Sequence, residues 1–458
     1  MKKRLMSVAV AAALAGAGSA NAVFVNQEGS GEALIYPYFT VEGGNDTYIN
    51  LVNTTNEYKA VKVRFLEAMN SKEVLDFNLY MSPRDHWSAV IYDDGEGASI
   101  RTADTTCTVP NSLGEGAEIE FRATEYADDS VNGRIRTREG YVEIIEMGVL
   151  TDSDDQAAIK HAAGVPDDCS VMSANWNTGG KWDAAEGADV DAPGGGLYGY
   201  GVLINVNEGT NATYDAVALD DFADPIAGDL HFAPGSVLPS LGNAGASADV
   251  LDSGSVTVVS DNFATGFDAV SAVLMHSSIQ NDYVLEPSIQ AGTDWVITFP
   301  TKFPYVNNGT DTATPPFTEV WDPETSLACE SITIEYWDRE EAENAPDPLD
   351  FSPAPDQDPF SLCHEANVLT INGSDVLSGS ERVASNLELA DGFDNGWMEI
   401  DFTGTDREVT SDGGIVFEGL PSVGFAVQKY VNGTLAGGTV LSNYAGVVQH
   451  KNLRSITP

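Results

Sequence analysis

Basic residues are scarce in this chain of 458 residues, which has 22 Lys and Arg against 70 Asp and Glu and a formal net charge of −48. Proteins neutralise nucleic-acid phosphates and anionic lipids with patches of Lys and Arg, and too few are present to build one. We therefore expect no nucleic-acid partner. The chain is not a disordered acidic tail, because 42% of its residues are hydrophobic. We expect it to fold.

Long apolar runs are missing after residue 22, so no later segment offers the roughly 18 apolar residues that a membrane-spanning helix needs. The first 22 residues differ: Lys2, Lys3 and Arg4 precede an apolar stretch at 8–17, and small residues follow at 19–22. This pattern is typical of a secretory signal peptide. We expect cleavage after Ala22 and export, which would bring the net charge to about −51.

Cysteine is rare, with four residues that allow three disulfide connectivities. An even number in an exported protein favours disulfides over free thiols. We favour Cys107 with Cys169 and Cys329 with Cys363, because each pair would staple a polar excursion between strand-like runs. A zinc site is disfavoured because the sequence contains no C-x-x-C pair.

Short runs of alternating hydrophobicity fill most of the chain. Val61, Val63 and Phe65 alternate with Lys62 and Arg64, so one side of this run should face a core and the other water. Turn residues separate the runs. The first five strands are expected at 33–41, 48–53, 60–67, 75–81 and 87–92. The spacing predicts an all-β, mainly antiparallel fold of one or more sandwich-like domains with long loops.

Helical periodicity is limited to two segments, 153–163 and 267–280. Asp152 is placed to cap the first, and an apolar stripe that includes Ile279 runs along the second. We expect an N-terminal sandwich-like domain at 23–192 and a C-terminal β-rich domain at 193–458, divided by the Gly-rich stretch 175–196. The alternative is one continuous sandwich in which that stretch is a long loop.

Common catalytic motifs are also missing. The sequence has no G-x-S-x-G elbow, no H-E-x-x-H helix and no phosphate-binding loop, and its six histidines lie far apart. We therefore expect a protein that is not an enzyme. A secreted hydrolase remains an alternative, because 70 acidic residues guarantee some close carboxylate pairs.

Acidic turns offer oxygen ligands for calcium, which binds carboxylates and backbone carbonyls. The metal-ligand candidates are Asp152 and Asp154 in the turn 152–155, and Asp391 and Asp394 in the turn 391–396. None of these turns matches an EF-hand loop, and solvated acidic turns are the alternative interpretation.

Aromatic residues cluster near the Gly-rich stretch: Trp176 and Trp182 lie within it, and Tyr198 and Tyr200 follow it. They could form a platform on which sugar rings stack. The competing interpretation is that they anchor the loop to the core, since large aromatic side chains are strong core anchors.

Several segments of the sequence resemble a known group of proteins: 33–41, 45–47, 59–67, 75–80 and 294–302. The group consists of exported proteins of marine and environmental proteobacteria and includes surface-layer proteins of the Alteromonas and Pseudoalteromonas kind. The similarity covers the N-terminal sixty residues well and the remainder in patches. It implies an acidic, β-rich protein at the cell surface, and no functional residue can be transferred from it.

Together these observations predict an exported structural protein of the cell surface that assembles with copies of itself in a cation-dependent, surface-layer-like way. Its partners would be itself and a surface glycan such as lipopolysaccharide. The alternative is a secreted carbohydrate-binding or adhesin module that uses Trp176 and Trp182. Arg64 and Glu67 are expected to form a structural ion pair.

Overall fold

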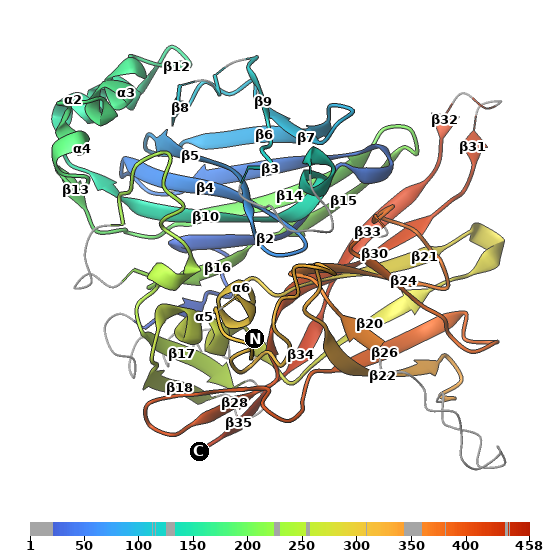
Figure 1. Cartoon of the computed structure of the whole chain (residues 1–458). Coiled ribbons are helices and arrows are strands. Elements are labelled where there is room, and N and C mark those ends of the chain that lie inside the picture. The colour runs from blue at the N-terminus through green and yellow to red at the C-terminus, as the bar shows by residue number, and fades with distance from the viewer. Residues whose placement is uncertain are drawn as a thin grey trace, which may run out of the picture.

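The protein is built from two β-sandwiches stacked one above the other, with a smaller layer of helix and strands beside them (Figure 1). We describe a computed structural model for residues 22–111, 113–114, 116–124, 133–223, 230–252, 257–307, 309–342, 360–380, 382–435, 438 and 440–458. Nearly all strand pairs are antiparallel, and the pairing of β24 (Ala366–Ile371) with β25 (Ala384–Leu387) is parallel. The predicted all-β, sandwich-like fold is confirmed. The predicted signal peptide lies outside the described residues, except for Ala22.

The first sandwich consists of two sheets that enclose the largest apolar core. The first sheet has the strand order β1 (Phe24–Val25), β16 (Val217–Asp220), β2 (Ala33–Thr40), β10 (Glu139–Leu150), β4 (Lys59–Glu67), β5 (Glu73–Met81) and β8 (Cys107–Val109), and β13 (Val190–Asp191) pairs with β10. The second sheet has the order β15 (Thr210–Asp215), β14 (Leu197–Asn205), β3 (Asn45–Asn53), β6 (His86–Asp93), β7 (Ala98–Arg101) and β9 (Glu118–Glu120).

Alternation along the strands explains this core. Val61, Val63 and Phe65 of β4 point into it, as predicted, and pack against Ile49 and Trp87 of the second sheet. Successive side chains of a strand point to opposite faces, so Lys62 and Arg64 lie outside this core. The expectation that they face water is wrong, because they are 0% and 7% exposed and form ion pairs. The first five predicted strands are found close to their expected positions, as β2 to β6.

The division between the sandwiches lies further along the chain than we expected. Strand β14 pairs with β3 over its full length, and β16 pairs with β2, so residues up to Asp220 complete the first sandwich. The Gly-rich stretch 175–196 is a loop of the first sandwich that leads into β14. A boundary at 192 is thus wrong, because composition marks a loop but not the sheet to which the next strand returns.

The second sandwich lies below the first in Figure 1. Its third sheet has the order β25, β24, β21 (Gly292–Thr298), β30 (Val423–Tyr430) and β33 (Tyr444–Gln449). Its fourth sheet has the order β23 (Phe360–Leu362), β22 (Glu330–Asp338), β26 (Asn395–Asp401), β20 (Ser278–Val284) and β34 (Lys451–Leu453). The ring of Phe425 on β30 stacks on Tyr214 of β15 with centroids 4.6 Å apart, so the two sandwiches share packed side chains.

The side layer is formed by α5 (Gly266–Leu274), which packs on the hairpin of β17 (Ser247–Asp252) and β18 (Thr257–Asn262) and has its own apolar core. The predicted helix 267–280 is correct for its first half only. Residues from Ser278 onward form β20 and pair with β26, so Ile279 belongs to the core of the second sandwich.

Three short helices cover one end of the first sheet: α2 (Ser153–Ile159), α3 (Ser170–Trp176) and α4 (Lys181–Ala184). Helix α2 confirms the start of the predicted segment 153–163, and the Asp152 side chain accepts hydrogen bonds from the backbone amides of Asp154 and Asp155. Both predicted disulfides are present, Cys107–Cys169 and Cys329–Cys363. The first ties α3 to β8.

Smaller elements complete the described chain. The short strands are β11 (His161–Ala162), β12 (Val165–Pro166), β19 (Met275–His276), β27 (Glu408–Thr410), β28 (Val416–Glu418), β29 (Leu420–Pro421), β31 (Thr434–Leu435), β32 (Val440–Leu441) and β35 (Ser455–Thr457). The remaining helices are α6 (Phe303–Val306) and the 3₁₀ turns η1 (Glu42–Gly44), η2 (Arg134–Arg138), η3 (Leu241–Asn243) and η4 (Pro287–Ile289). Within the described part of the chain, no helix is long and apolar enough to span a membrane.

Several buried ion pairs involve residues of β4. The expected pair of Arg64 with Glu67 does not form: Arg64 bonds Glu143 at 2.5 Å and Glu73 at 2.8 Å. Glu67 instead pairs with Arg136 of η2 at 2.8 Å. The two residues are three apart on one strand, so their side chains point to opposite faces and cannot meet.

Candidate interaction surface

The outward side of the second sheet carries few charged residues. The inward residues of β3, β6 and β14, such as Ile49, Trp87 and Leu203, are buried in the core. The residues between them point outward, and most are apolar or aromatic rather than polar. We call this surface the tyrosine face; it is formed by Tyr48, Val52, Val90, Tyr92, Tyr198, Tyr200, Val202 and Ile204.

Strand register brings these side chains together. Val202, Tyr48 and Val90 lie directly opposite one another on β14, β3 and β6, and form a row across the sheet. Tyr198 lies opposite Val52 in a parallel row. Cross-strand partners are close enough to pack, which is why several of these side chains are only half-exposed. Tyr48 and Tyr198 remain 38% and 39% exposed, so the surface is open to solvent.

Two glycines explain why β14 presents its tyrosines outward. The sequence of this strand begins Leu197, Tyr198, Gly199, Tyr200, Gly201. A Cβ atom on Gly199 would lie 1.8 Å from the hydroxyl of Tyr36, and one on Gly201 would lie 2.2 Å from the ring of Tyr214. Both core tyrosines therefore require glycine at the inward positions, and the aromatic residues of β14 occupy the outward ones.

Charge is nearly absent from the tyrosine face. Asp46 is the only Asp, Glu, Lys or Arg at the outward positions of β3, β6 and β14, all of which are described. Burial raises the pKa of Asp46, and the guanidinium of Arg101 opposes this effect. Arg101 also stacks on Tyr92, with its guanidinium carbon 4.7 Å from the ring centroid. The face is thus close to neutral in a chain of net charge −48.

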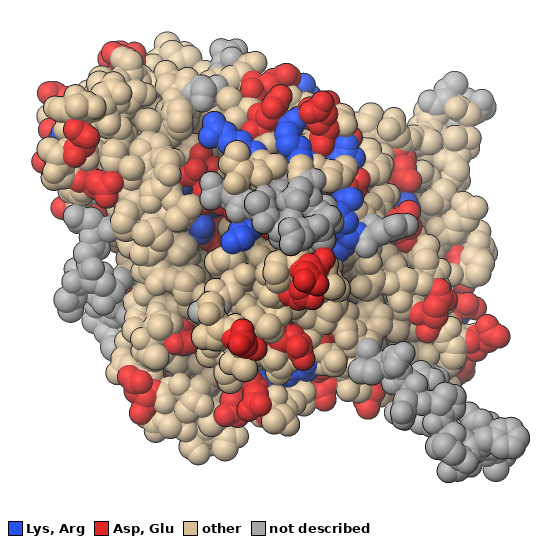
Figure 2. Space-filling view, viewed as in Figure 1, with Lys and Arg blue, Asp and Glu red and all other residues tan. Residues whose placement is uncertain are grey.

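The visible basic residues gather elsewhere, in the upper half of Figure 2, where they are interspersed with acidic residues. Arg134 bonds the carboxylate of Asp94, and Arg138 bonds Asp93 at 2.7 Å. The arginine–carboxylate pair holds the pKa of Asp94 well below its usual range, with further hydrogen bonds from Ser99 and backbone amides. Arg134 and Arg138 are thus engaged by carboxylates of the same molecule.

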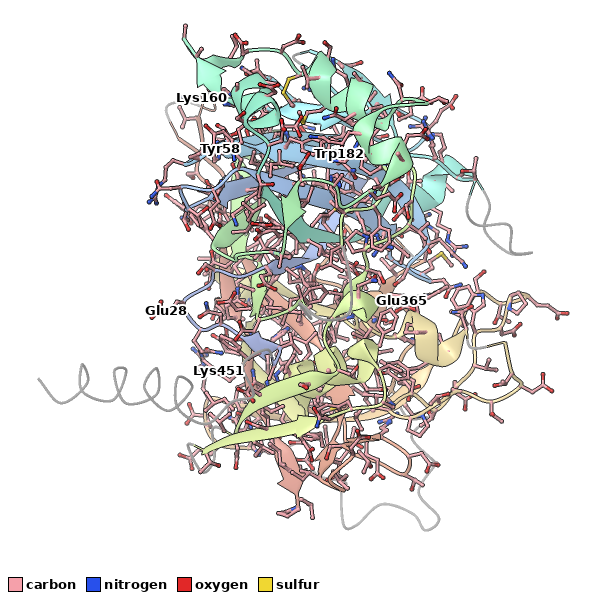
Figure 3. The ribbon with its side chains drawn as sticks, turned by 90° about the vertical axis from the view of Figure 1, so that its left-hand side faces the viewer. Glu28, Tyr58, Lys160, Trp182, Glu365 and Lys451 are labelled. Carbon is pink, nitrogen blue, oxygen red and sulfur yellow. A yellow bond between two sulfur atoms is a disulfide. The ribbon has the colours of Figure 1, made fainter. Side chains whose placement is uncertain are left out.

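The tryptophans of the predicted sugar platform do not form a surface with Tyr198 and Tyr200, which lie on the tyrosine face. Trp182 is fully buried and stacks on Tyr80, with centroids 5.5 Å apart. Its indole nitrogen donates to the carbonyl of Ala188, and that of Trp176 donates to the Tyr80 hydroxyl. Figure 3 shows Trp182 within the helical end of the first sandwich. The competing interpretation, in which these tryptophans anchor the loop, is therefore correct.

The four predicted calcium ligands do not come together. Asp152 caps α2 and lies 3.9 Å from Lys181, while Asp154 is exposed. Asp391 and Asp394 are exposed in the turn before β26, in the other sandwich. In the part of the chain that the structure describes, no group of three or more His, Cys, Asp or Glu residues is placed to hold a metal ion.

A second aromatic site was missed by the sequence interpretation. Trp337 of β22 and Trp397 of β26 lie opposite each other and stack, with ring centroids 4.1 Å apart. Trp397 is 40% exposed on the outer side of the fourth sheet. The alternation of Trp397 with buried Met398 and Ile400 is visible in the sequence, but the pairing of two distant strands is not.

Comparison with known proteins adds no assignment: no protein-family model, no curated protein and no solved structure matches this chain. The functional inference must therefore come from the surfaces described above.

Proposed function

We propose that this protein is an exported structural protein of the cell surface that associates with copies of itself through the tyrosine face. The observation that carries the proposal is an open, nearly uncharged sheet face on a strongly acidic chain. Large exposed apolar patches on folded proteins mark interaction sites. The leader sequence and the two disulfides support export, since disulfides persist in oxidising compartments.

A second copy is the partner that fits this face best. Copies of a chain with net charge −48 repel one another wherever their carboxylates meet. Two tyrosine faces can approach without bringing many carboxylates together. Antiparallel sheets pack face to face through interdigitating side chains. The three strands β14, β3 and β6 span roughly 400 Å², about half of the roughly 800 Å² per partner of a stable interface, so flanking residues of β15 and β7 must contribute the rest.

A layer needs more than one contact. A two-fold interface closes on itself and yields a dimer, so a lattice requires a further contact between dimers. We place that contact at the acidic surface, where divalent cations such as Ca²⁺ would bridge carboxylates of neighbouring copies. Attachment to the envelope would be non-covalent, through a surface glycan such as lipopolysaccharide.

Sedimentation velocity of the processed protein over a range of concentrations tests the self-association. The double variant Tyr48→Lys, Tyr198→Lys places two cations on the face of each copy and is expected to shift the dimer to monomer. The double variant Tyr444→Lys, Val448→Lys is the matched control, because these side chains are 57% and 36% exposed on β33 of the second sandwich. A wild-type protein that stays monomeric, or a double variant that dimerises like wild type, would overturn the proposal.

Electron cryotomography of the native envelope before and after calcium chelation tests the location. An ordered outer layer that dissolves with the chelator and releases this chain is the expected result. A bare envelope, with the protein free in the medium, would contradict the structural role.

Saccharide binding is a second candidate function, favoured by the stacked pair Trp337 and Trp397. Exposed indole rings provide apolar faces on which pyranose rings pack. Asp282 lies opposite Trp397 on β20, and Glu399 accepts a hydrogen bond from Gln280 at 2.9 Å, so carboxylates and an amide surround the rings. Glycan-array binding that is lost in Trp397→Ala and kept in Tyr48→Ala would support this function; equal binding by both variants would exclude the tryptophan pair.

A further inference from the structure

A cavity of about 260 Å³ lies where the N-terminal strand β1, the end of α5 and the second sandwich meet. Its walls are mainly aliphatic: Val25, Val217, Val250, Val273, Ile279 and Ile297. Gln27, Gln449 and Asn452 also line it and are exposed, so the cavity opens to the surface between them. Glu28 and Lys451, the chain neighbours of Gln27 and Asn452, lie on the same side of the molecule in Figure 3.

Arg454 supplies a positive charge to this cavity. Its two terminal guanidinium nitrogens donate to backbone carbonyls at the end of α5, with distances of 2.8 Å to Met275 and 2.7 Å to Val273. These bonds hold the guanidinium in place and leave Nε without a hydrogen-bond partner among the described residues. Burial lowers the pKa of Arg454 to about 10, opposed by Asp252, so the side chain stays charged at neutral pH.

Two histidines complete the polar lining. His450 is fully used: its Nε2 bonds the carbonyl of Val296 at 3.0 Å and its Nδ1 bonds Asn281 at 3.0 Å. His276 bonds Ser422 through Nδ1 at 3.1 Å, and its Nε2 has no partner in the described part of the chain. Burial lowers the pKa of both rings, to about 4 for His450, so both are neutral at pH 7.

One carboxylate residue lies in the wall of this cavity. Asp249 is the only acidic residue among the described residues that line it. Its neighbour Val250 packs into the core beneath α5. Asp249 is itself buried, 7% exposed, and its Oδ1 has no hydrogen-bond partner among the described residues. The groups that can donate hydrogen bonds to a ligand are a guanidinium, an imidazole and exposed amides, set in aliphatic walls.

We propose that this cavity binds a small organic acid, with its carboxylate directed to Arg454 and His276 and its apolar body against the valines and isoleucines. Charge-assisted hydrogen bonds from a guanidinium to a carboxylate are among the strongest polar contacts in proteins. A cavity of about 150 Å³ admits benzene, so the larger volume here suits a ring that carries a carboxylate. The site lies apart from the tyrosine face and does not depend on the proposed self-association.

Isothermal titration calorimetry with sodium benzoate tests the proposal, with benzyl alcohol as the neutral analogue of the same shape. Benzoate is expected to bind saturably, and at least about tenfold more tightly than benzyl alcohol. Val217→Phe fills the cavity and should lower the affinity for benzoate by at least about tenfold. Val206→Phe is the matched control, since Val206 is 74% exposed in the β14–β15 turn, and it should leave the affinity unchanged.

Arg454→Gln keeps a hydrogen-bond donor but removes the charge, and it is expected to abolish the preference for benzoate over benzyl alcohol. Near-UV circular dichroism identifies the variants that keep the native packing. Benzoate binding to Val217→Phe or Arg454→Gln, whichever keeps that packing, then tests the proposal. Absence of saturable benzoate binding to the wild type, equal affinity for the two ligands, or unchanged binding to the folded cavity variants would each overturn the proposal.

Discussion

At the scale of single residues, the most consequential group is Glu365, a fully buried carboxyl between the two sandwiches (Figure 3). Its backbone amide donates to the carbonyl of Ala68 in the first sandwich, and its own carbonyl accepts from Phe299 in the second. Burial raises the pKa of Glu365 from 4.5 to about 8, while the nearby ammonium of Lys302 lowers it. The stability of the junction between the two sandwiches should therefore depend on pH, through the protonation of Glu365.

Replacing this group should flatten the pH dependence of stability. Between about 4.5 and about 8, folded Glu365 keeps a proton that the unfolded chain releases, so stability falls as pH rises through this range. Glu365→Gln removes the penalty and should raise the thermal midpoint most at pH above 8. Thermal unfolding across pH measures it, with the exposed Glu335→Gln as control. Parallel pH profiles for Glu365→Gln and wild type would refute this assignment.

Trp182 shows the difference between a buried and a surface tryptophan. Trp182→Ala removes a fully buried indole that stacks on Tyr80, and should lower the free energy of unfolding by about 3–5 kcal/mol. Trp397→Ala removes a side chain that is 40% exposed and should cost less than about 1 kcal/mol. Urea unfolding compares the two. Equal costs would show that Trp182 is not the core anchor that its burial indicates.

At the scale of elements, alternation along a strand is the most informative pattern. It correctly predicted the inward residues of β4, and in β14 it separates glycines that face the core from tyrosines that face solvent. Helical periodicity was less reliable: the stripe that ends at Ile279 runs from α5 into β20. A short apolar run fits both the helical period of 3.6 residues and the strand period of 2. Pairing with β26 makes the residues from Ser278 onward a strand.

The disulfide Cys107–Cys169 should matter most for the helical end of the first sandwich. It links residues 62 apart in sequence and ties α3 to β8. Closing a loop of this length is worth about 4 kcal/mol in the chain-entropy model. The double variant Cys107→Ser, Cys169→Ser should lower the thermal midpoint and expose α2–α4 to limited proteolysis. An unchanged midpoint and digestion pattern would show that the helices are held by packing alone.

At the scale of the whole molecule, net charge governs behaviour in solution. A charge of −48 means that the folded chain repels itself, and added salt screens this repulsion. Raising NaCl from about 10 mM to about 0.5 M shortens the screening length several-fold and should raise the thermal midpoint. Differential scanning calorimetry measures the change. A midpoint that is independent of salt would mean that the carboxylates are too well dispersed to repel.

Divalent cations should act on association more strongly than on folding. If Ca²⁺ bridges carboxylates of neighbouring copies, CaCl₂ and MgCl₂ should each promote assembly beyond NaCl of equal ionic strength. Light scattering of the processed protein compares the three salts. Assembly promoted by Ca²⁺ alone would instead indicate a selective calcium site. If neither divalent cation promotes assembly, the proposed role of cations is wrong.

Features that depend on neighbouring residues can be predicted from the sequence, whereas features that depend on contacts between distant residues require the tertiary structure. Alternation and turn residues are local, and they sufficed to predict an all-β sandwich-like fold. The Asp152 cap is also local and predicted the start of α2, and the positions of the four cysteines between strand-like runs predicted both disulfides. Which strands pair is set by contacts between distant residues, and only the tertiary structure returns β14 to the first sandwich and places Trp337 against Trp397. An alternating strand has two sides in any sequence; the fold decides which side another sheet covers, and so it buries Trp182 and leaves Tyr48 and Tyr198 exposed.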